Sequence, residues 1–347
     1  MLTTNNHIAV IRLSAMGDVA ITVPVLKALT EQHPNLKITV VSRPFFKPFF
    51  TQLNNIAFFE VDLSNRHKGF VGLIRLFLDL KKLKINTVAD LHNVLRSKII
   101  RTLFLFSGSK TAATNKGRAA KTALTRAENK NFEPVKTMFQ NHVETFNKLG
   151  YALELSNPSF LEKEVLTSEL IKLIGENHSK LIGIAPFAKY DSKAYPLDLM
   201  QEVIDILALN SNYKILLFGG GTKETELLNK LQNNHSNVIN VAGKIKLQEE
   251  LKLISNLNVM LSMDSGNSHV AAMLGVKVVT LWGATHPFAG FSPFNQPLEN
   301  CLVSDREKFP MLPTSIYGNK KVVGYEDVMR TISVEKIVFS VQSQLAD

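Results

Sequence analysis

The sequence predicts an α/β protein made of two Rossmann-like domains, each a doubly wound parallel sheet. Short apolar runs alternate with helical periodicity along most of the chain, which is typical of parallel sheets covered by helices. The same rhythm occurs in both halves, and 347 residues suit two domains of ordinary size. We expect an N-terminal domain at residues 1–165, a C-terminal domain at residues 175–330 and a terminal helix at residues 331–347 near the domain interface.

The expected strands are short apolar runs, and helical patterns fill the gaps between them. In the first half we expect strands at residues 7–13, 37–41, 56–61 and 87–90, and helices at 22–32, 70–84 and 140–149. In the second half we expect strands at 181–185, 213–218, 238–241, 259–263 and 276–282, and helices at 196–209, 223–232, 247–255 and 268–274. The polar segment 156–180 is expected to cross between the domains. Val334, Ile337, Val338 and Val341 share one face of the terminal helix.

Composition excludes several classes of protein. The chain is 45% hydrophobic and 20% charged, as is usual for globular proteins. No apolar run approaches the ~20 residues that span a bilayer, and no signal-peptide core stands at the start. Cys301 is the only cysteine, so no internal disulfide can form. We therefore expect a cytoplasmic protein.

Basic charge is concentrated in the first half of the chain. Residues 1–150 hold 22 Lys and Arg against 9 Asp and Glu, whereas residues 151–347 hold 18 against 21. The excess is densest in residues 107–134, a long segment without clear structure that contains Lys116, Arg118 and Lys121. The asymmetry favours an anionic partner, either a phosphorylated saccharide or a membrane surface. Nucleic acid is the weakest candidate, because no recognition motif is present. The alternative is a merely solvated surface.

The segment MDSGNSHVAAMLGVKVVTLWGATHP predicts an anion site. It reads as a strand, a polar turn, a helix and a second strand. Asp264, Ser265 and Gly266 would then lie at a helix N-terminus, where unpaired backbone N–H groups attract phosphate oxygens. His269 falls one turn further, on the face towards the turn. The alternative is an ordinary helix cap without a ligand.

The first strand ends in a similar loop. Ser14, Gly17 and Asp18 follow it, at the carboxyl end where open α/β sheets bind ligands. Gly17 would permit a positive φ or a close backbone approach. Asp18 would either contribute chemistry or simply cap the next helix. Because each half of the chain contains such a loop, the two together indicate a ligand site more strongly than either does alone.

Three further features belong to the second half. Lys193 precedes a helix start, where it would neutralise a phosphate as a point charge. Gly219 and Gly220 end a strand, although their spacing is not the dinucleotide fingerprint, which makes a nicotinamide oxidoreductase a distant candidate. Ile245 lies before another helix and would form an apolar wall for a base.

Several motifs together resemble the ADP-heptose:lipopolysaccharide heptosyltransferases, glycosyltransferase family nine. They are RLSAMGDVAITVPVLKAL, VADLHNVLRSKII, KAYPLDLM, FGGGTKETELL, VAGKIKLQEELKLI and MDSGNSHVAAMLGVKVVTLWGATHP, in order from residue 12 to residue 287. The resemblance implies a GT-B architecture, in which two Rossmann-like domains face a cleft. It implies a nucleotide-sugar donor in the second domain and an acceptor in the first.

The resemblance also implies roles for individual residues. Asp18 matches the general base, and Lys193 matches the lysine near the diphosphate. The donor site is expected to include Ser14, Gly17, Lys193, Gly219, Gly220, Ile245, Asp264, Ser265, Gly266 and His269. The acceptor is expected near Asn93, Arg96, Lys116, Arg118 and Lys121. Where some members carry a Glu near the nucleoside, this chain has Gly221 or Thr222, so the donor could differ from ADP-heptose.

The expected activity is inverting transfer of a sugar, heptose above all, from a nucleotide sugar to an anionic cell-envelope glycolipid. No two Asp residues are separated by a single residue, so we expect a reaction without a metal or cofactor. Peripheral contact with the cytoplasmic face of the inner membrane would follow from such an acceptor. The alternative is a non-catalytic homologue that binds a nucleotide sugar or a glycan.

Overall fold

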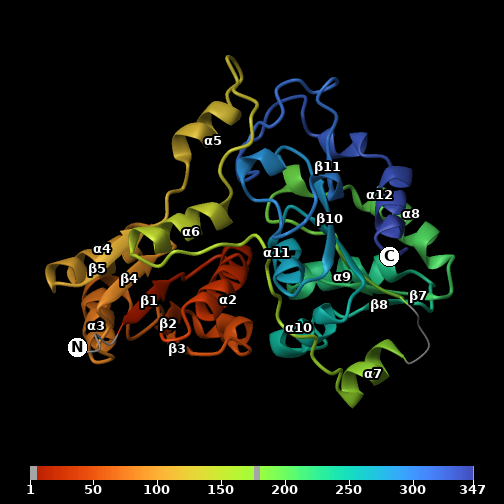
Figure 1. The fold of residues 1–347 in the computed structure, drawn as a ribbon. Coiled ribbons are helices and arrows are strands. Elements are labelled where there is room, and N and C mark those ends of the chain that lie inside the picture. The colour runs from red at the N-terminus through yellow and green to blue at the C-terminus, as the bar shows by residue number, and fades with distance from the viewer. Residues whose placement is uncertain (1–5, 176–179, 347) are drawn as a thin grey trace. The chain divides into compact units, whose positions relative to one another are not determined.

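The computed structural model describes residues 6–175 and 180–346, and it divides into two compact units (Figure 1). The first unit comprises residues 1–116 and 138–161, and the second comprises residues 117–137 and 162–347. The expected crossing segment 156–180 therefore contains one boundary, after residue 161, although its residues 176–179 lie outside the described part. Within it α7 (Ser168–Ile174) belongs to the second unit, where Thr167 caps the helix.

The first unit contains a five-stranded parallel sheet in the order β3-β2-β1-β4-β5. The strands are β1 (His7–Ile11), β2 (Lys37–Ser42), β3 (Ile56–Glu60), β4 (Thr87–Asp90) and β5 (Lys110–Ala113). All five residues of β1 are buried, as expected of a central strand covered on both faces. The winding direction reverses between β1 and β4, so the loops after these two strands are neighbours at the carboxyl edge.

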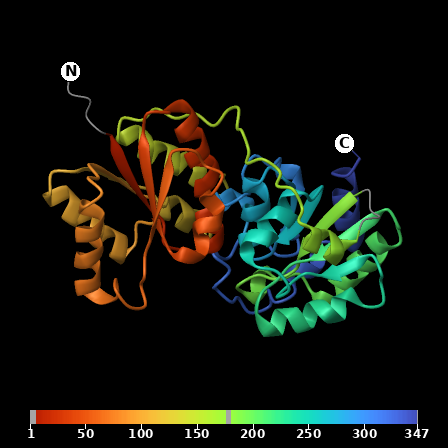
Figure 2. The ribbon, with the colours of Figure 1, turned by 90° about the horizontal axis from the view of Figure 1, so that it is seen from below.

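Helices cover both faces of this sheet (Figure 2). α3 (Gly69–Lys81) packs against α4 (Leu95–Phe106) on one face, and α2 (Thr22–Gln32) packs against α6 (Met138–Lys148) on the other. The short helix α1 (Met16–Ala20) directly precedes α2, and the 3-10 helix η1 (Pro44–Phe50) follows β2. Phe77 and Phe104 meet edge to face between α3 and α4, with ring centroids 5.0 Å apart.

The second unit contains a six-stranded parallel sheet in the order β11-β10-β9-β6-β7-β8. The strands are β6 (Lys180–Ala185), β7 (Tyr213–Leu217), β8 (Val238–Asn240), β9 (Val259–Met263), β10 (Lys277–Trp282) and β11 (Cys301–Val303). Here the winding direction reverses between β6 and β9. The loops after β6 and β9 are therefore neighbours at the carboxyl edge, as those after β1 and β4 are in the first unit.

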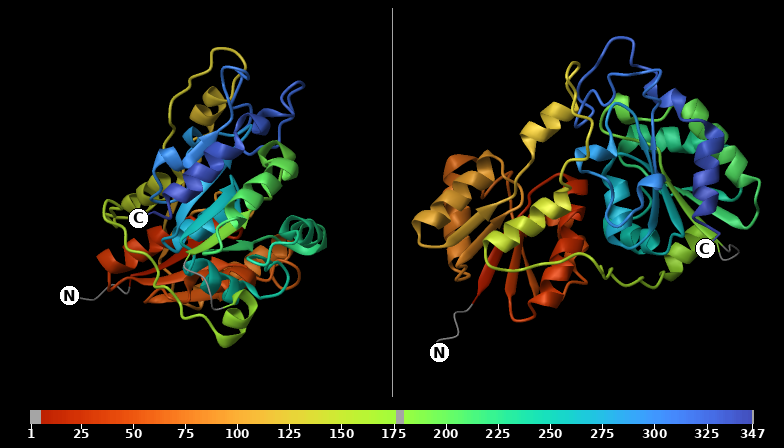
Figure 3. Two further views of the ribbon diagram at one scale, coloured as in Figure 1. Left: turned by 90° about the vertical axis from the view of Figure 1, so that its right-hand side faces the viewer. Right: turned by 45° about the horizontal axis from the view of Figure 1, so that its top comes forward.

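Helices again lie on both faces of the sheet (Figure 3). One face carries α8 (Leu197–Ala208), α9 (Gly221–Gln232) and α12 (Val334–Ser343), and the other carries α10 (Leu247–Ser255) and α11 (Gly266–Met273). The 3-10 helices are η2 (Asp191–Lys193), η3 (Pro287–Ala289), η4 (Leu298–Asn300) and η5 (Val328–Thr331). The terminal helix α12 packs against α8 of its own unit and buries the expected apolar face.

The basic segment 107–134 differs from the expected unstructured loop. It contains β5 and α5 (Arg118–Leu124), and residues 117–137 pack within the second unit instead of the first. The reason is contact with residues after β10. The Val135 amide donates to the Phe288 carbonyl at 2.9 Å, and the Arg306 guanidinium lies 3.4 Å from the centroid of the Phe132 ring.

The basic excess nevertheless stays with the first unit. This unit holds 17 Lys and Arg against 8 Asp and Glu, whereas the second holds 23 against 22. Within the described residues, no helix is long and apolar enough to cross a bilayer.

Candidate functional site

In the first unit, an ion pair fixes Asp18 after β1. The Arg12 guanidinium contacts Asp18 Oδ2 at 2.5 Å, and the Ala15 amide donates to the same oxygen at 3.2 Å. Arg12 also donates to the carbonyls of Ser14, at 2.8 Å, and Leu91, at 2.6 Å. Because Leu91 follows β4, Arg12 connects the two neighbouring loops. The Asp18 side chain is 33% exposed and hence accessible to a ligand.

Gly17 has no positive φ, so only one of its two expected uses, a close backbone approach, stays a prediction. It lies within α1, where its carbonyl accepts a hydrogen bond from the Ile21 amide at 2.9 Å, and it is buried. It is absent from the glycines with positive φ. The short helix begins immediately after the loop, so Gly17 has helical backbone and is not part of a left-handed turn.

Two buried histidines lie close enough to this ion pair to respond to its charge. Burial, together with the charges of Arg12 and Lys116, lowers the pKa of His92 to about 4. Burial and then the charge of Arg12 lower the pKa of His142, on α6, to about 3. Both imidazoles are therefore neutral near pH 7 and add no charge beside the Arg12–Asp18 pair.

Three of the expected acceptor residues belong to the first unit, where one shapes a turn and two are cations. Asn93 has a φ of 46°, and its side chain donates to the Thr114 carbonyl at 2.8 Å, so it shapes the turn after β4. Arg96 is exposed in the first turn of α4. Lys116 is half-buried and lies close enough to His92 to affect its pKa. Arg96 and Lys116 are thus two of the cations near this edge.

The other two expected acceptor residues belong to the second unit. Arg118 is exposed at the start of α5. Lys121 is only 4% exposed, and its ammonium lies 3.9 Å from the centroid of the Phe291 ring. The structure thus corrects the expectation that Lys121 is an exposed anion-binding residue, because a cation–π contact holds it inside the second unit.

In the second unit, Lys193 and Asp264 form an ion pair at the point where the winding reverses. Lys193 follows β6 and Asp264 follows β9, and their Nζ and Oδ2 atoms lie 2.9 Å apart. The Thr285 hydroxyl donates to the same carboxylate oxygen at 2.8 Å. The two side chains are 12% and 9% exposed. Asp264 therefore fixes the position of the Lys193 ammonium, which is largely removed from water. In such surroundings the attraction between an ammonium and a phosphate is stronger than in bulk water.

Two glycines allow the backbone to approach Lys193. A Cβ atom on Gly318, whose φ is 80°, would lie 2.6 Å from Cγ and Cδ of Lys193. A Cβ atom on Gly283 would lie 2.4 Å from the Ser192 carbonyl oxygen. The Ser192 hydroxyl donates to the Gly318 carbonyl at 2.6 Å. The backbone of Gly318 therefore lies against the aliphatic part of Lys193, and that of Gly283 lies against the preceding residue, Ser192.

A helix N-terminus lies beside this ion pair. Ser265 is the N-cap residue of α11, and Gly266 is its first residue. The Ser268 hydroxyl donates to the Ser265 carbonyl at 2.8 Å, and the Ser265 hydroxyl lies 3.1 Å from that of Ser262. The backbone N–H groups of the first turn and the helix dipole favour an anion here. His269 is buried on the same helix.

The remaining expected donor residues lie after β7 and β8. The Gly220 amide donates to Glu224 Oε2 at 2.7 Å, and Gly221 has a φ of 76°. A Cβ atom on Gly220 would meet nothing within 4 Å, so space is open beside this turn. Ile245 is half-buried in the turn before α10. These loops share the carboxyl edge with Lys193 and Asp264, and this edge supplies the Lys193 cation, the N-terminus of α11 and an open glycine turn.

Sequence reasoning missed four contributors to these sites. They are Arg12, Thr285, Gly283 and Gly318. Thr285, Gly283 and Gly318 act through partners that are distant along the chain, so no local motif marks them. Arg12 stands at the end of a strand, where nothing in the local sequence indicates that it pairs with Asp18. Glu224 supplies an acid two to three residues after Gly221 and Thr222, the positions at which the resemblance implied one.

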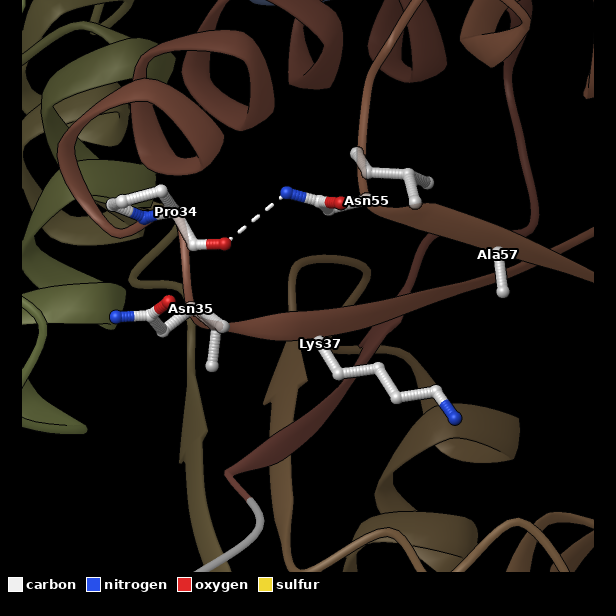
Figure 4. A pocket seen from close by; sticks show the side chains of 7 residues that line it. Pro34, Asn35, Lys37, Asn55 and Ala57 are labelled. Atoms are coloured by element: carbon white, nitrogen blue, oxygen red, sulfur yellow. Dashed lines mark hydrogen bonds between the residues drawn. The ribbon is translucent and has the colours of Figure 1, made fainter. Parts of the chain in front are cut away.

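Two other features do not form part of the site. A shallow hollow at the amino ends of β2 and β3 is lined by Pro34, Asn35, Leu36, Lys37, Asn55, Ile56 and Ala57 (Figure 4). The Asn55 amide spans it by donating to the Pro34 carbonyl at 3.1 Å. It lies at the edge opposite Asp18. No group of three His, Cys, Asp or Glu side chains able to hold a metal ion occurs among the described residues.

Comparison with known proteins identifies the family. Residues 73–318, more than half of the chain, match the family model described as Glycosyltransferase family 9 (heptosyltransferase). The chain is 22% identical to the lipopolysaccharide core heptosyltransferase OpsX of Haemophilus influenzae, with 95% of this chain and 94% of that protein covered. It is 24% identical to lipopolysaccharide heptosyltransferase 1 of Campylobacter coli, with 80% and 84% covered.

Solved structures agree on the fold. The glycosyl transferase family 9 protein from Veillonella parvula gives a TM-score of 0.75 at 20% identity, covering 100% of this chain and 99% of that one. The E. coli heptosyltransferase WaaC with ADP gives a TM-score of 0.66 at 17% identity, covering 98% of each chain. The expected GT-B class of two Rossmann-like domains is confirmed.

The shifted histidines make stability depend on pH. An unfolded histidine has a pKa of ~6.5, whereas the pKa of His142 is about 3 in the fold. Between these values the unfolded state binds a proton that the folded state does not. Stability therefore falls as pH drops from 7 to 5, by about 2 kcal/mol from this residue. His142→Gln should reduce that fall in denaturant titrations at the two pH values, and an unchanged difference would contradict the assignment.

Proposed function

Since the chain belongs to glycosyltransferase family 9, the heptosyltransferases, and is a glycosyltransferase, we propose that it moves heptose from ADP-heptose onto the lipopolysaccharide core. The family and the homologues named above support lipopolysaccharide heptose transfer. The finer statements, namely the donor, inversion at the anomeric carbon and independence of metal, rest on the arrangement of side chains at the two carboxyl edges. No cofactor other than the donor substrate is required.

The observation that carries the donor site is the Lys193–Asp264 ion pair beside the N-terminus of α11. In the proposed complex, the Lys193 ammonium and the N–H groups near Gly266 bind the diphosphate. These groups are preorganised, so they stabilise negative charge as it builds on the leaving diphosphate. Asp264 and Thr285 orient the ammonium. The open turn at Gly220 and the half-buried Ile245 are proposed to receive the nucleoside.

The proposed base is Asp18. Its carboxylate is fixed by Arg12 and by the Ala15 amide, yet it is partly exposed. In a single displacement, Asp18 takes the proton of the acceptor hydroxyl as the oxygen attacks the anomeric carbon. The bond from that carbon to the diphosphate breaks, and the configuration inverts. The neutral His92 and His142 add no positive charge beside the base.

The acceptor is proposed to be an anionic cell-envelope glycolipid bound by the first unit. This unit carries an excess of 17 Lys and Arg over 8 Asp and Glu. Arg96 and Lys116 lie at the edge of Asp18 and are proposed to contact its anionic groups. We place the reaction in the cytoplasm, with peripheral contact at the inner membrane, because such an acceptor is anchored there.

A second candidate is a non-catalytic homologue that binds a nucleotide sugar or a glycan. The carboxylate of Asp18 is fixed by Arg12 and the Ala15 amide and is still accessible. This arrangement favours an enzyme over a binding protein, because a binding protein needs no base at this position. The direct test mixes the purified chain with ADP-heptose and a heptose-deficient lipopolysaccharide core, and follows ADP release. Nucleotide binding without release on any acceptor would favour the binding protein.

Replacing the base separates catalysis from binding. Asp18→Asn keeps the shape of the side chain but cannot accept the proton, so kcat should fall at least about hundredfold. Calorimetric affinity for ADP should remain within about twofold, because the nucleotide is bound by the other unit. Asp62→Asn, on the loop after β3, serves as the control and should be fully active. Transfer within tenfold of the wild type in Asp18→Asn would remove this residue from the base role.

Removing the lysine should weaken diphosphate binding selectively. Lys193→Ala loses a charge-assisted contact to phosphate, so the Kd for ADP should rise at least about tenfold. The Kd for adenosine should hardly change. Lys189→Ala, which removes an exposed lysine from the same loop, is the matched control. Equal losses for ADP and adenosine would show that Lys193 supports the nucleoside or the fold instead.

Independence of metal is tested with a chelator. Transfer should continue in excess EDTA, since Lys193 and the α11 N-terminus take the role that a cation has on a diphosphate. Added Mg²⁺ or Mn²⁺ should leave kcat unchanged. Activity that disappears with EDTA and returns with either ion would contradict this mechanism.

A further inference from the structure

Exposed apolar side chains line the carboxyl edge of the first sheet. Phe45 is 56% exposed, Phe70 64%, Val71 60% and Leu95 75%. Each lies where the chain leaves this edge: Phe45 on η1 after β2, Phe70 and Val71 on α3 after β3, and Leu95 on α4 after β4. We call these four residues the apolar rim. The other large apolar side chains exposed in the described first unit, Leu78, Leu83, Leu105 and Phe106, lie towards or just after the C-terminal ends of α3 and α4, at the opposite edge. The rim is therefore singled out by its place beside the loop of Asp18 and by its basic neighbours, and exposed apolar groups of this size mark interaction surfaces.

The rim lies among basic residues. Segments 43–47, 64–71 and 93–98, which contain it, hold six Lys and Arg and no Asp or Glu. Lys47 is paired with Glu60, and Arg66 is paired with Asp79. Within the described chain, no carboxylate lies within ion-pair distance of the other four, which are Arg43, Lys68, Arg96 and Lys98. This combination of exposed apolar and basic side chains fits a surface that is apolar inside and anionic outside.

The apolar rim lies at the same edge of the sheet as Asp18, which relates it to the proposed reaction. β2 and β4 lie on either side of β1, so their loops flank the loop that carries Asp18. A glycolipid acceptor keeps its acyl chains in the bilayer while its sugar reaches the base. The bilayer must then lie near the edge that holds Asp18, and the rim is at this edge.

We propose that the apolar rim and its basic neighbours dock the first unit on an anionic lipid bilayer. Phe45, Phe70, Val71 and Leu95 enter the boundary between headgroups and acyl chains, and Lys68 and Lys98 contact the anionic headgroups. The direction of docking rests on the proposed function, because only a membrane-anchored acceptor requires the bilayer at this edge. Docking itself requires neither nucleotide nor acceptor sugar.

Sedimentation with vesicles tests the rim against matched exposed residues. The full chain is mixed with phosphatidylglycerol–phosphatidylcholine vesicles, or with phosphatidylcholine alone, without any sugar nucleotide. Phe45→Ser/Phe70→Ser removes two rim phenylalanines, whereas Phe106→Ser/Phe339→Ser removes two that are 85% and 72% exposed elsewhere, on α4 at the opposite edge and on α12. The rim variant should bind anionic vesicles about tenfold more weakly, and the matched variant should bind as the wild type does.

A charge pair gives a second, independent measurement. Lys68→Gln/Lys98→Gln should lower binding to anionic vesicles about twenty-five-fold, since each exposed cation near an anionic surface contributes about fivefold. Lys172→Gln/Lys336→Gln, exposed in the second unit, should not lower it. Binding of the wild type should weaken as salt rises and should be poor on phosphatidylcholine.

The outcomes separate this proposal from the proposed function. Rim variants should transfer sugar normally to a delipidated, water-soluble acceptor and should lose rate only on an acceptor embedded in vesicles. Thermal unfolding close to that of the wild type excludes misfolding as the cause. The proposal that the rim docks on the bilayer would be overturned if the rim and matched variants bound vesicles equally well. It would also be overturned if the matched variant lost more vesicle binding than the rim variant. Vesicle binding that follows the rim in a chain unable to transfer any sugar would overturn only the proposed function.

Discussion

The reversal of winding direction within each sheet is the constraint on which the candidate sites depend. It makes β1 a neighbour of β4 in the first unit and β6 a neighbour of β9 in the second. Loops that are about 70 to 80 residues apart along the chain thereby meet at one carboxyl edge. Each meeting point is fixed by one arginine or lysine paired with one aspartate: Arg12 with Asp18, and Lys193 with Asp264. The first pair presents a carboxylate, and the second presents an ammonium, so similar folds provide opposite charges.

The sequence was sufficient to predict the architecture and the main loop residues. Strand and helix patterns follow from local apolar periodicity, and the sites follow from the rule that loops at carboxyl ends bind ligands. Asp18, Lys193 and Asp264 could be proposed for this reason. Thr285, Gly283 and Gly318 could not, because their importance lies in contacts with Asp264, Ser192 and Lys193, and residues so far apart in sequence give no local signal. β5 and β11 were also missed, since strands of four and three residues carry too few positions to show a period.

Lys121 shows why charge patterns mislead at single residues. The count of basic residues correctly indicates a basic first unit, yet one of the lysines chosen from it is buried over Phe291 in the second. A lysine has a long aliphatic stem and a cation that an aromatic ring can hold, so it does not need to remain in water. Composition therefore describes the charge of a surface better than it identifies the members of a binding site.

The path of residues 117–137 affects how the protein can be made. The chain passes from the first unit to the second, returns, and passes over again after residue 161. During synthesis on the ribosome, Phe132 and Val135 emerge long before Phe288 and Arg306, the residues that cover them. The first unit can close once residue 161 has left the exit tunnel, while this segment stays uncovered for some 150 further residues. Phe132 and Val135 stay exposed during that time, and exposed apolar side chains on a nascent chain are prone to aggregation and are bound by chaperones. Expression of residues 162–347 alone would likewise produce a second unit that lacks residues 117–137, which contact Phe288 and Arg306.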